Sequence, residues 1–166
     1  NVSTTQSWNS LTSAYNTVAS NAITITGGTY VWNGGTGSWS TGANWTPNIM
    51  GGPNSSDANV IIPSGTVTLD MAPTINSLSL ESGATLNLVG YNLTAAGGFS
   101  NSGTLRLNGA QTITVPTNNS GSTVDYYGGS GALVAGSSYA NLLVSGGTRT
   151  ASAALSASAV SISSGA

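Results

Sequence analysis

Charged side chains are the first candidates for chemistry, and the 166-residue chain has only six of them. It contains no Lys, His or Cys, the usual general bases, Schiff-base amines and thiolate nucleophiles. Hydrolysis of a glycosidic bond needs two carboxyl groups within about 10 Å of each other, and the carboxylates here are spread along the chain. We therefore expect no catalytic residue. The charged residues are Asp57, Asp70, Glu81, Asp125, Arg106 and Arg149.

The charge pattern excludes several further classes of function. Calcium-binding repeats place Asp after Gly-Gly pairs, and the Gly-Gly pairs here lack it, so we expect no metal and no cofactor. A net charge of -2 without a basic cluster gives no electrostatic basis for binding nucleic acid or anionic membranes. Val60-Ile61-Ile62, typical of the longest apolar runs, is far too short for a membrane span.

Three tryptophans form the second candidate site. Trp32, Trp39 and Trp45 lie in a stretch rich in Gly, Ser and Asn. They could form an aromatic platform that stacks on sugar rings. Alternatively, they plug the end of a hydrophobic core, where each indole buries a large apolar area and its N–H group finds a hydrogen-bond partner. We favour the plug, because it requires only that neighbouring loops pack closely over the core.

Modification and ice binding are the remaining site hypotheses. Asn-x-Ser/Thr sequons are candidate glycosylation acceptors if the source organism modifies its surface proteins. Thr-x-Thr pairs suggest an ice-binding array, but they fall in different phases of the repeat, and the β-propensity of Thr explains them. The sequons are at Asn1, Asn44, Asn54, Asn92 and Asn118.

A repeated turn motif supplies the scaffold for these residues. Ser-Gly followed by Thr or a small residue and an aliphatic residue recurs at intervals of roughly 18–25 residues. Each copy leads into a short strand in which apolar and polar residues alternate. Windows of about 20 residues with two or three short strands are typical of a parallel β-helix. The turn glycines of the repeat are Gly65, Gly83, Gly103, Gly121, Gly146 and Gly165.

The alternation predicts which side chains face the core. We expect an all-β, right-handed parallel β-helix of 18–25-residue coils, with an antiparallel sandwich as the alternative fold. Neighbouring coils lie about 4.8 Å apart, so equivalent residues stack in columns, and Arg106 should lie beside Asp125. The expected inward residues are Val67, Leu69, Leu86, Leu88, Leu105, Leu107, Val124 and Tyr126. The outward residues are Thr66, Thr68, Thr85, Asn87, Thr104, Arg106, Thr123 and Asp125.

The two ends of the chain differ from this repeat. Apolar residues at helical spacing in 5–19 predict a short amphipathic helix that caps the first coil or docks onto another subunit. We divide the chain into an N-terminal cap or docking segment (1–29), a Trp-rich opening module (30–62) and the solenoid repeats (63–166). The last residues look like half of another repeat, so we expect a piece of a longer repeat protein.

The opening module carries a family resemblance. It resembles the start of bacterial surface-repeat proteins of the autotransporter-adhesin and filamentous-haemagglutinin-like β-helix type, and the resemblance covers roughly residues 30–166. No Asn-Pro motif of the haemagglutinin-type secretion domains occurs, so the resemblance does not extend to that secretion route. The matching runs are Tyr30-Val31-Trp32-Asn33-Gly34-Gly35, Gly37-Ser38-Trp39-Ser40, Ala43-Asn44-Trp45, Ser56-Asp57-Ala58-Asn59-Val60-Ile61-Ile62 and residues 141–150.

The resemblance implies an extracellular or cell-surface protein, and the absence of Cys fits a core built by stacking. We expect a structural or adhesive β-solenoid, either a stalk or a fibre-forming subunit. Its expected partners are further copies of itself or a host or cell-surface glycan. The main alternative is a glycan-binding module that uses the Trp cluster, and weaker ones are an ice-binding solenoid and a polysaccharide-cleaving β-helix.

Overall fold

Almost all of the regular structure is β-strand, because short runs of alternating apolar and polar residues are separated by Gly, Ser and Asn turns. The computed structural model describes residues 27–109 and 111–163. One short 3-10 helix, η1 (Gly42–Asn44), lies in the first coil. The strands are β1 (Gly28–Trp32), β2 (Thr36–Ser38), β3 (Trp45–Thr46), β4 (Ala58–Ile62), β5 (Gly65–Thr68), β6 (Thr74–Leu80), β7 (Ala84–Asn87), β8 (Thr94–Asn101), β9 (Thr104–Leu107), β10 (Thr117–Asn118), β11 (Thr123–Tyr126), β12 (Gly131–Ala132), β13 (Ser138–Val144), β14 (Arg149–Thr150) and β15 (Ser156–Ile162).

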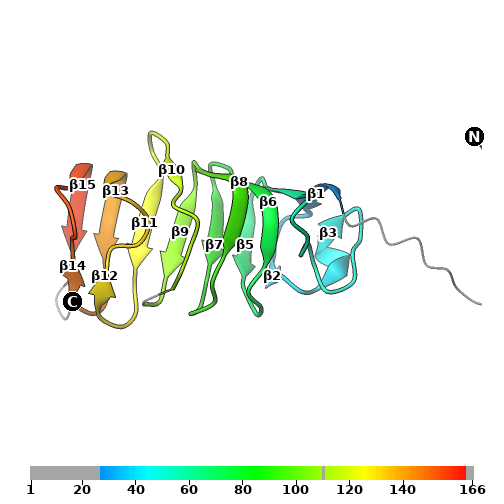
Figure 1. Cartoon of the computed structure of the whole chain (residues 1–166), viewed down its shortest axis with the longest axis horizontal. Coiled ribbons are helices and arrows are strands. Elements are labelled where there is room, and N and C mark those ends of the chain that lie inside the picture. The colour runs from blue at the N-terminus through cyan, green and yellow to red at the C-terminus, as the bar shows by residue number, and fades with distance from the viewer. Residues whose placement is uncertain (1–26, 110, 164–166) are drawn as a thin grey trace, which may run out of the picture.

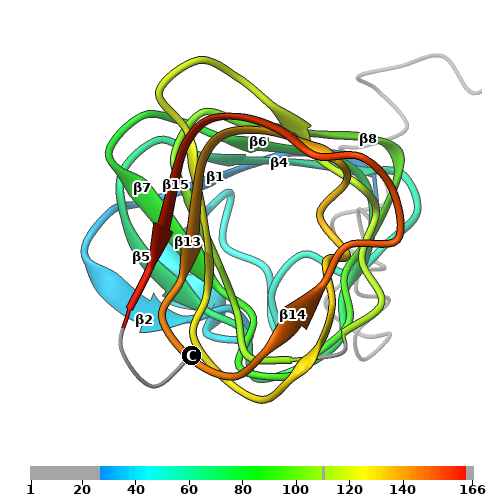
Figure 2. The same cartoon turned by 90° about the vertical axis from the view of Figure 1, so that its left-hand side faces the viewer.

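The strands stack into an elongated β-solenoid (Figure 1). A six-stranded sheet, sheet A, has the order β10-β8-β6-β4-β1-β3, and a seven-stranded sheet, sheet B, has the order β15-β13-β11-β9-β7-β5-β2. All pairs in both sheets are parallel except β1 with β3. A two-stranded pair, β12 with β14, contributes to a third side, visible in the end view of Figure 2. The parallel pairing excludes the antiparallel sandwich.

Sheet B confirms the predicted columns. Thr66, Thr85, Thr104 and Thr123 pair in succession at a constant spacing, and Thr36 extends the column into the first coil. We call the sequence separation of paired residues on neighbouring strands the step. The steps from β11 to β13 and from β13 to β15 are each one residue shorter than the step of the threonine column. The eight residues that were predicted to face inward are all buried. They lie on β5, β7, β9 and β11 or directly follow one of these strands. They join one hydrophobic cluster that runs from Tyr30 to Leu142.

The turn glycines do not form one column, which corrects the simplest interpretation of the motif. Gly65 pairs with Ala84, so Gly83 lies one position earlier in its coil. The reason is the turn length: Ala84 and Ser122 stand between the glycine and the strand threonine in two copies, and no such residue occurs in the other two. The constant spacing of the threonines, and not the alternating spacing of the glycines, is the period of the coil.

The position predicted for Gly146 in the coil is also wrong. Gly146 follows β13, and its amide donates to the Tyr126 carbonyl oxygen at 3.1 Å. It therefore lies at the opposite end of the sheet B strand from Gly121, and the long coil that the spacing of these two glycines suggests does not exist. After the first coil, the observed steps differ only slightly from the period of the threonine column. Gly165 lies outside the described residues.

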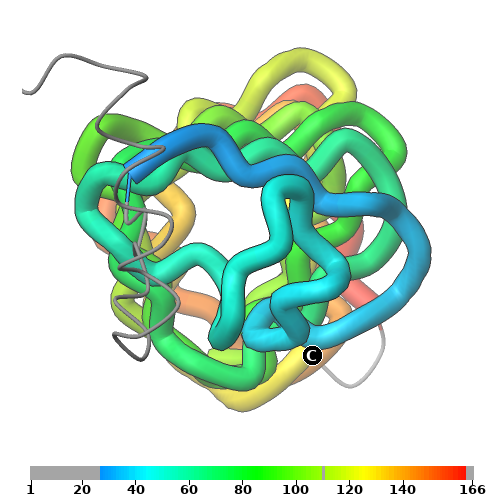
Figure 3. Tube along the Cα trace, turned by 90° about the vertical axis from the view of Figure 1, so that its right-hand side faces the viewer, coloured from blue at the N-terminus to red at the C-terminus, as the bar shows by residue number. Residues whose placement is uncertain are grey.

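The first coil is longer and irregular. The step from Thr36 to Thr66 far exceeds the later steps, because β3 turns back to pair antiparallel with β1. Figure 3, viewed from this end, shows the cyan segment folding inward across the end of the stack. β1 crosses the boundary expected at residue 29, and the opening module shares its core with the repeats. The predicted helix at 5–19 lies outside the described residues.

Candidate functional site

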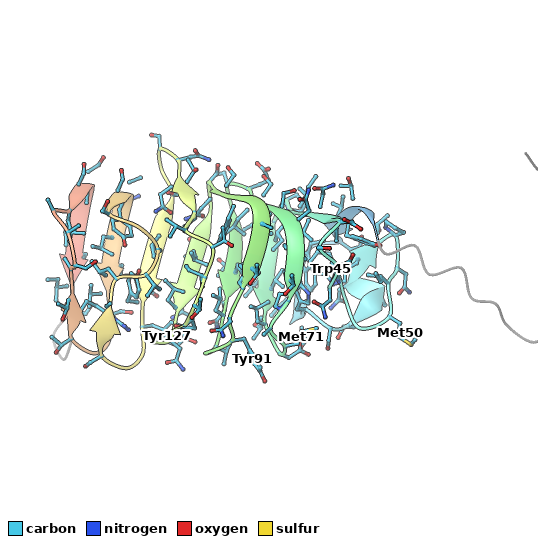
Figure 4. The ribbon with its side chains drawn as sticks, viewed as in Figure 1. Trp45, Met50, Met71, Tyr91 and Tyr127 are labelled. Atoms are coloured by element: carbon cyan, nitrogen blue, oxygen red, sulfur yellow. The ribbon has the colours of Figure 1, made fainter. Side chains whose placement is uncertain are left out.

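The three predicted tryptophans meet inside the first coil. Trp32 comes from the end of β1, Trp39 follows β2, and Trp45 begins β3. The Trp45 ring packs edge-on against both others, with ring centroids 5.0 Å from Trp32 and 4.9 Å from Trp39. Figure 4 shows Trp45 near this end of the rod, with the highly exposed Met50 beyond it.

The indole cluster (Trp32, Trp39 and Trp45) is at most 1% exposed. The Trp39 indole N–H donates to the Pro53 carbonyl oxygen at 2.9 Å, and that of Trp45 donates to the Trp39 carbonyl oxygen at 2.7 Å. The Trp32 Nε1 atom is buried without a partner in the described structure. Sugar stacking needs an exposed ring face, which these indoles do not offer. Their packing is that of a plug at the end of the core.

Four of the five sequons lie within the described residues, and they differ in accessibility. The Asn44 and Asn118 amide nitrogens donate to backbone carbonyl oxygens and are partly buried. Asn54 and Asn92 are exposed and use their side-chain oxygens to accept backbone N–H groups from the next coil. Glycosylation occurs at the amide nitrogen, so Asn54 and Asn92 are the more accessible acceptors. Asn1 lies outside the described residues.

The predicted neighbours Arg106 and Asp125 form an ion pair across β9 and β11. The Arg106 Nε atom lies 3.0 Å from the Asp125 Oδ2 atom. Ser145 donates its hydroxyl to the other carboxylate oxygen at 2.5 Å. Arg106 also stacks over the Tyr127 ring, 4.4 Å from its centroid. Asp125 was predicted to face outward but is buried, because its strand lies between β9 and β13 and both of its carboxylate oxygens are hydrogen-bonded to neighbouring side chains.

Arg149 and two tyrosines form a second polar group, which sequence reasoning did not identify. The Arg149 guanidinium stacks over the Tyr126 ring at 4.7 Å. Its Nε and Nη1 atoms are buried without a hydrogen-bond partner, and this burial lowers the Arg149 pKa. The Tyr126 hydroxyl accepts the backbone N–H groups of Val134 and Ala135. Burial, together with Tyr126, raises the pKa of Tyr139 above its usual range.

The remaining carboxylates do not assemble into a site. Asp70 accepts hydrogen bonds from the backbone and the hydroxyl of Ser40. Glu81 accepts the Ser79 hydroxyl, and Asp57 is exposed. Within residues 27–109 and 111–163, no group of three or more His, Cys, Asp or Glu side chains could hold a metal ion.

An apolar surface lies at the β15 end of the rod. Val160 and Ile162 pair with the buried residues Leu142 and Val144 of β13, so they continue the core-facing columns. They are 57% and 68% exposed because, among the described residues, nothing pairs with the outer edge of β15. With Leu155 they border a pocket of about 240 Å³ that also contains Arg149. We call Leu155, Val160, Ile162 and this edge the β15 end surface.

A shallow groove crosses the outer face of sheet A. Its volume is about 550 Å³, and it spans β1, β4, β6, β8 and β10. No charged side chain lines it, and its walls carry hydroxyl and amide groups. An extra residue in β8 shifts the register with β6 and brings Gly98 level with Ser77. The polar side chains of this sheet A groove are Thr29, Asn59, Ser77, Ser79, Ser100 and Thr117.

Comparisons with known proteins add no family to what the fold defines. No family model, curated protein or solved structure matches the chain. In the part of the chain that the structure describes, no helix has the length and apolarity to cross a membrane. The chain is a parallel β-solenoid repeat protein.

Proposed function

We propose that this chain is a non-catalytic structural segment of an extracellular microbial surface protein, in which the β-solenoid forms a stalk or the repeating body of a fibre. The observation that carries the proposal is the in-register stacking of sheet B from β2 to β15. Each coil contacts its neighbours along continuous hydrogen-bonded ladders, which gives a stiff rod. The resemblance of residues 30–166 to adhesin and haemagglutinin-like repeats supports a surface location.

Self-association is the form of assembly that the rod supports. The β15 end surface combines an unpaired strand edge with apolar side chains, and strand edges of this kind pair with further strands. In a longer chain the next coil would cover Val160 and Ile162, and in a fibre of this segment a strand of another copy would do so. Net charge near zero per coil favours such contacts, because like-charge repulsion is small. Within the described residues, three buried indoles fill the first coil, whereas apolar side chains are exposed at β15, so these two coils are not equivalent.

A pair of lysine substitutions on β15 tests assembly. Val160→Lys places a charge in the core-facing column, whereas Ser161→Lys places the same charge in the outward column of the same strand. Negative-stain electron microscopy and sedimentation velocity over a range of concentrations would measure assembly. We expect oligomers or filaments for the wild type and Ser161→Lys, and monomers for Val160→Lys. Wild-type protein that stays monomeric at every concentration contradicts the fibre version, as does unchanged assembly of Val160→Lys.

A further inference from the structure

We propose that the sheet A groove binds a neutral, linear carbohydrate chain that lies along the rod axis. This site is separate from the indole cluster and from the β15 end surface, and it does not depend on self-association. Five consecutive strands of sheet A contribute to it, so a ligand would cross successive coils and not follow a single strand.

Four polar side chains of the groove, Asn59, Ser77, Ser79 and Ser100, are held in place by hydrogen bonds within the protein. The Asn59 side-chain oxygen accepts hydrogen bonds from the Asn76 amide at 2.8 Å and from the Ser77 hydroxyl at 2.6 Å. This orients the Asn59 amide so that its NH₂ group remains available as a donor of two hydrogen bonds. The Ser100 oxygen accepts the Asn119 amide at 2.9 Å, which leaves its own O–H group to donate.

The electrostatics of the groove disfavour anionic ligands. Neither arginine of the chain lines it. The carboxylate of Glu81 accepts a hydrogen bond from the Ser79 hydroxyl of the groove. A sulfated or carboxylated polymer would be desolvated here without a compensating cation. Hydroxyl groups of a neutral sugar are both donors and acceptors, and they match the mixture of Ser, Thr and Asn side chains.

The spacing of equivalent residues along the groove is similar to the length of one sugar unit in a linear polymer. Ile61, Ser79, Ser100 and Thr117 are successive partners across the strands, and Thr29, Asn59, Ser77 and Gly98 form the adjacent row. Within each row, the spacing is about 4.8 Å, the distance between hydrogen-bonded strands. Each pyranose unit adds a similar length to a linear chain. Successive sugars would therefore contact equivalent positions on successive strands.

The backbone of β8 provides room for a sugar ring at Gly98. Gly98 has a φ of +123°, and no atom lies within 4 Å of the position that a Cβ would occupy there. The row of side chains is therefore interrupted by a notch. Partly buried Ile61 on β4 provides an apolar patch suited to the C–H face of a sugar.

Affinity electrophoresis of the full chain in gels that contain hydroxyethylcellulose, mannan or dextran would test binding. Heparin and polygalacturonate serve as polyanionic probes. We expect retardation by at least one neutral polymer and by neither polyanion. Asn59→Asp keeps the oxygen that accepts from Asn76 and Ser77 but removes both donors, so we expect at least tenfold weaker binding. Ser100→Val, which removes a groove hydroxyl, should also weaken it.

Thr85→Val is the matched control, because it removes an outward hydroxyl from sheet B. We expect wild-type affinity for this variant, and far-UV circular dichroism and the melting temperature would confirm that all three variants fold. Absence of binding to every neutral polymer overturns the proposal. Preference for heparin, or equal affinity of wild type and both groove variants, also overturns it. None of these outcomes affects assembly through the β15 end surface, which the Val160→Lys comparison tests independently.

Discussion

The ion pair between Arg106 and Asp125 gives a quantitative test of the stacking. The Asp125 side chain is 8% exposed and that of Arg106 is 36% exposed. Removing one partner of a fully buried pair costs about 3–5 kcal/mol, whereas exposed pairs contribute about 0–1 kcal/mol. Because one partner reaches solvent, we expect Arg106→Leu to lower the free energy of unfolding by about 2 kcal/mol, between these limits.

A double-mutant cycle separates the pair from its surroundings. Asp125→Asn keeps the shape of the side chain and an oxygen for the Ser145 hydroxyl, and we expect a loss of about 1 kcal/mol. The double variant should lose less than the sum, with a coupling of about 1–2 kcal/mol. Urea unfolding with equal m-values would measure these free energies. Asp57→Asn is the control at an exposed carboxylate, expected within about 0.5 kcal/mol of wild type.

The coupling energy is the decisive quantity. A value below about 0.5 kcal/mol would be typical of sites that do not interact. That result would contradict a stabilising contact between the two side chains.

Three further predictions concern the core and its ends. Trp39→Ala and Trp45→Ala should each lower the free energy of unfolding by at least about 3 kcal/mol, measured by urea unfolding, because each removes a buried indole; unchanged stability would contradict the plug. Burial raises the folded-state pKa of Tyr139 above its ordinary value of 10.0, so its contribution to stability is complete below pH 10 and is lost as the pH rises further. Melting temperatures should therefore fall above pH 10, and less steeply in Tyr139→Phe; identical profiles would refute this. Gly103→Ala would push a methyl group into two backbone carbonyl oxygens and should destabilise the protein by about 1–3 kcal/mol in the same urea assay, unlike Gly109→Ala, where nothing lies within 4 Å; equal effects would argue against this close contact.

The sheet B columns could be predicted from sequence because their cause is local. A strand that alternates Thr with Leu or Val can bury only one of its faces, and the same alternation in several copies fixes the register between them. That reasoning placed Arg106 beside Asp125 correctly. It failed where turn length changed, because inserting Ala84 or Ser122 before the threonine of the strand moves the glycine and leaves the threonine column unchanged.

The candidate sites were harder to predict, since they depend on how separate segments meet. The burial of Trp39 requires loop residues as distant as Pro53 to cover it. The sheet A groove depends on one extra residue in β8, and the Gly97-Gly98 pair was the only sequence signal for it. The Ser145-Gly146 motif looks like another copy of the repeat, but only the observed pairing shows that it lies at a different corner.

The unequal steps of the two sheets determine where the chain tolerates changes in length. Sheet B keeps a nearly constant step after the first coil. The step in sheet A varies more, since Asn101 lies farther along the chain from its partner Leu80 than from its other partner, Asn118. One of the added residues lies within β8, and the corners between the sheets absorb the other additions and deletions that distinguish one coil from the next. A peptide tag or small domain could be grafted at such a corner, for example between β7 and β8, where Val89 and Tyr91 are exposed. Deleting a single residue from β9 would instead turn its buried leucines toward water.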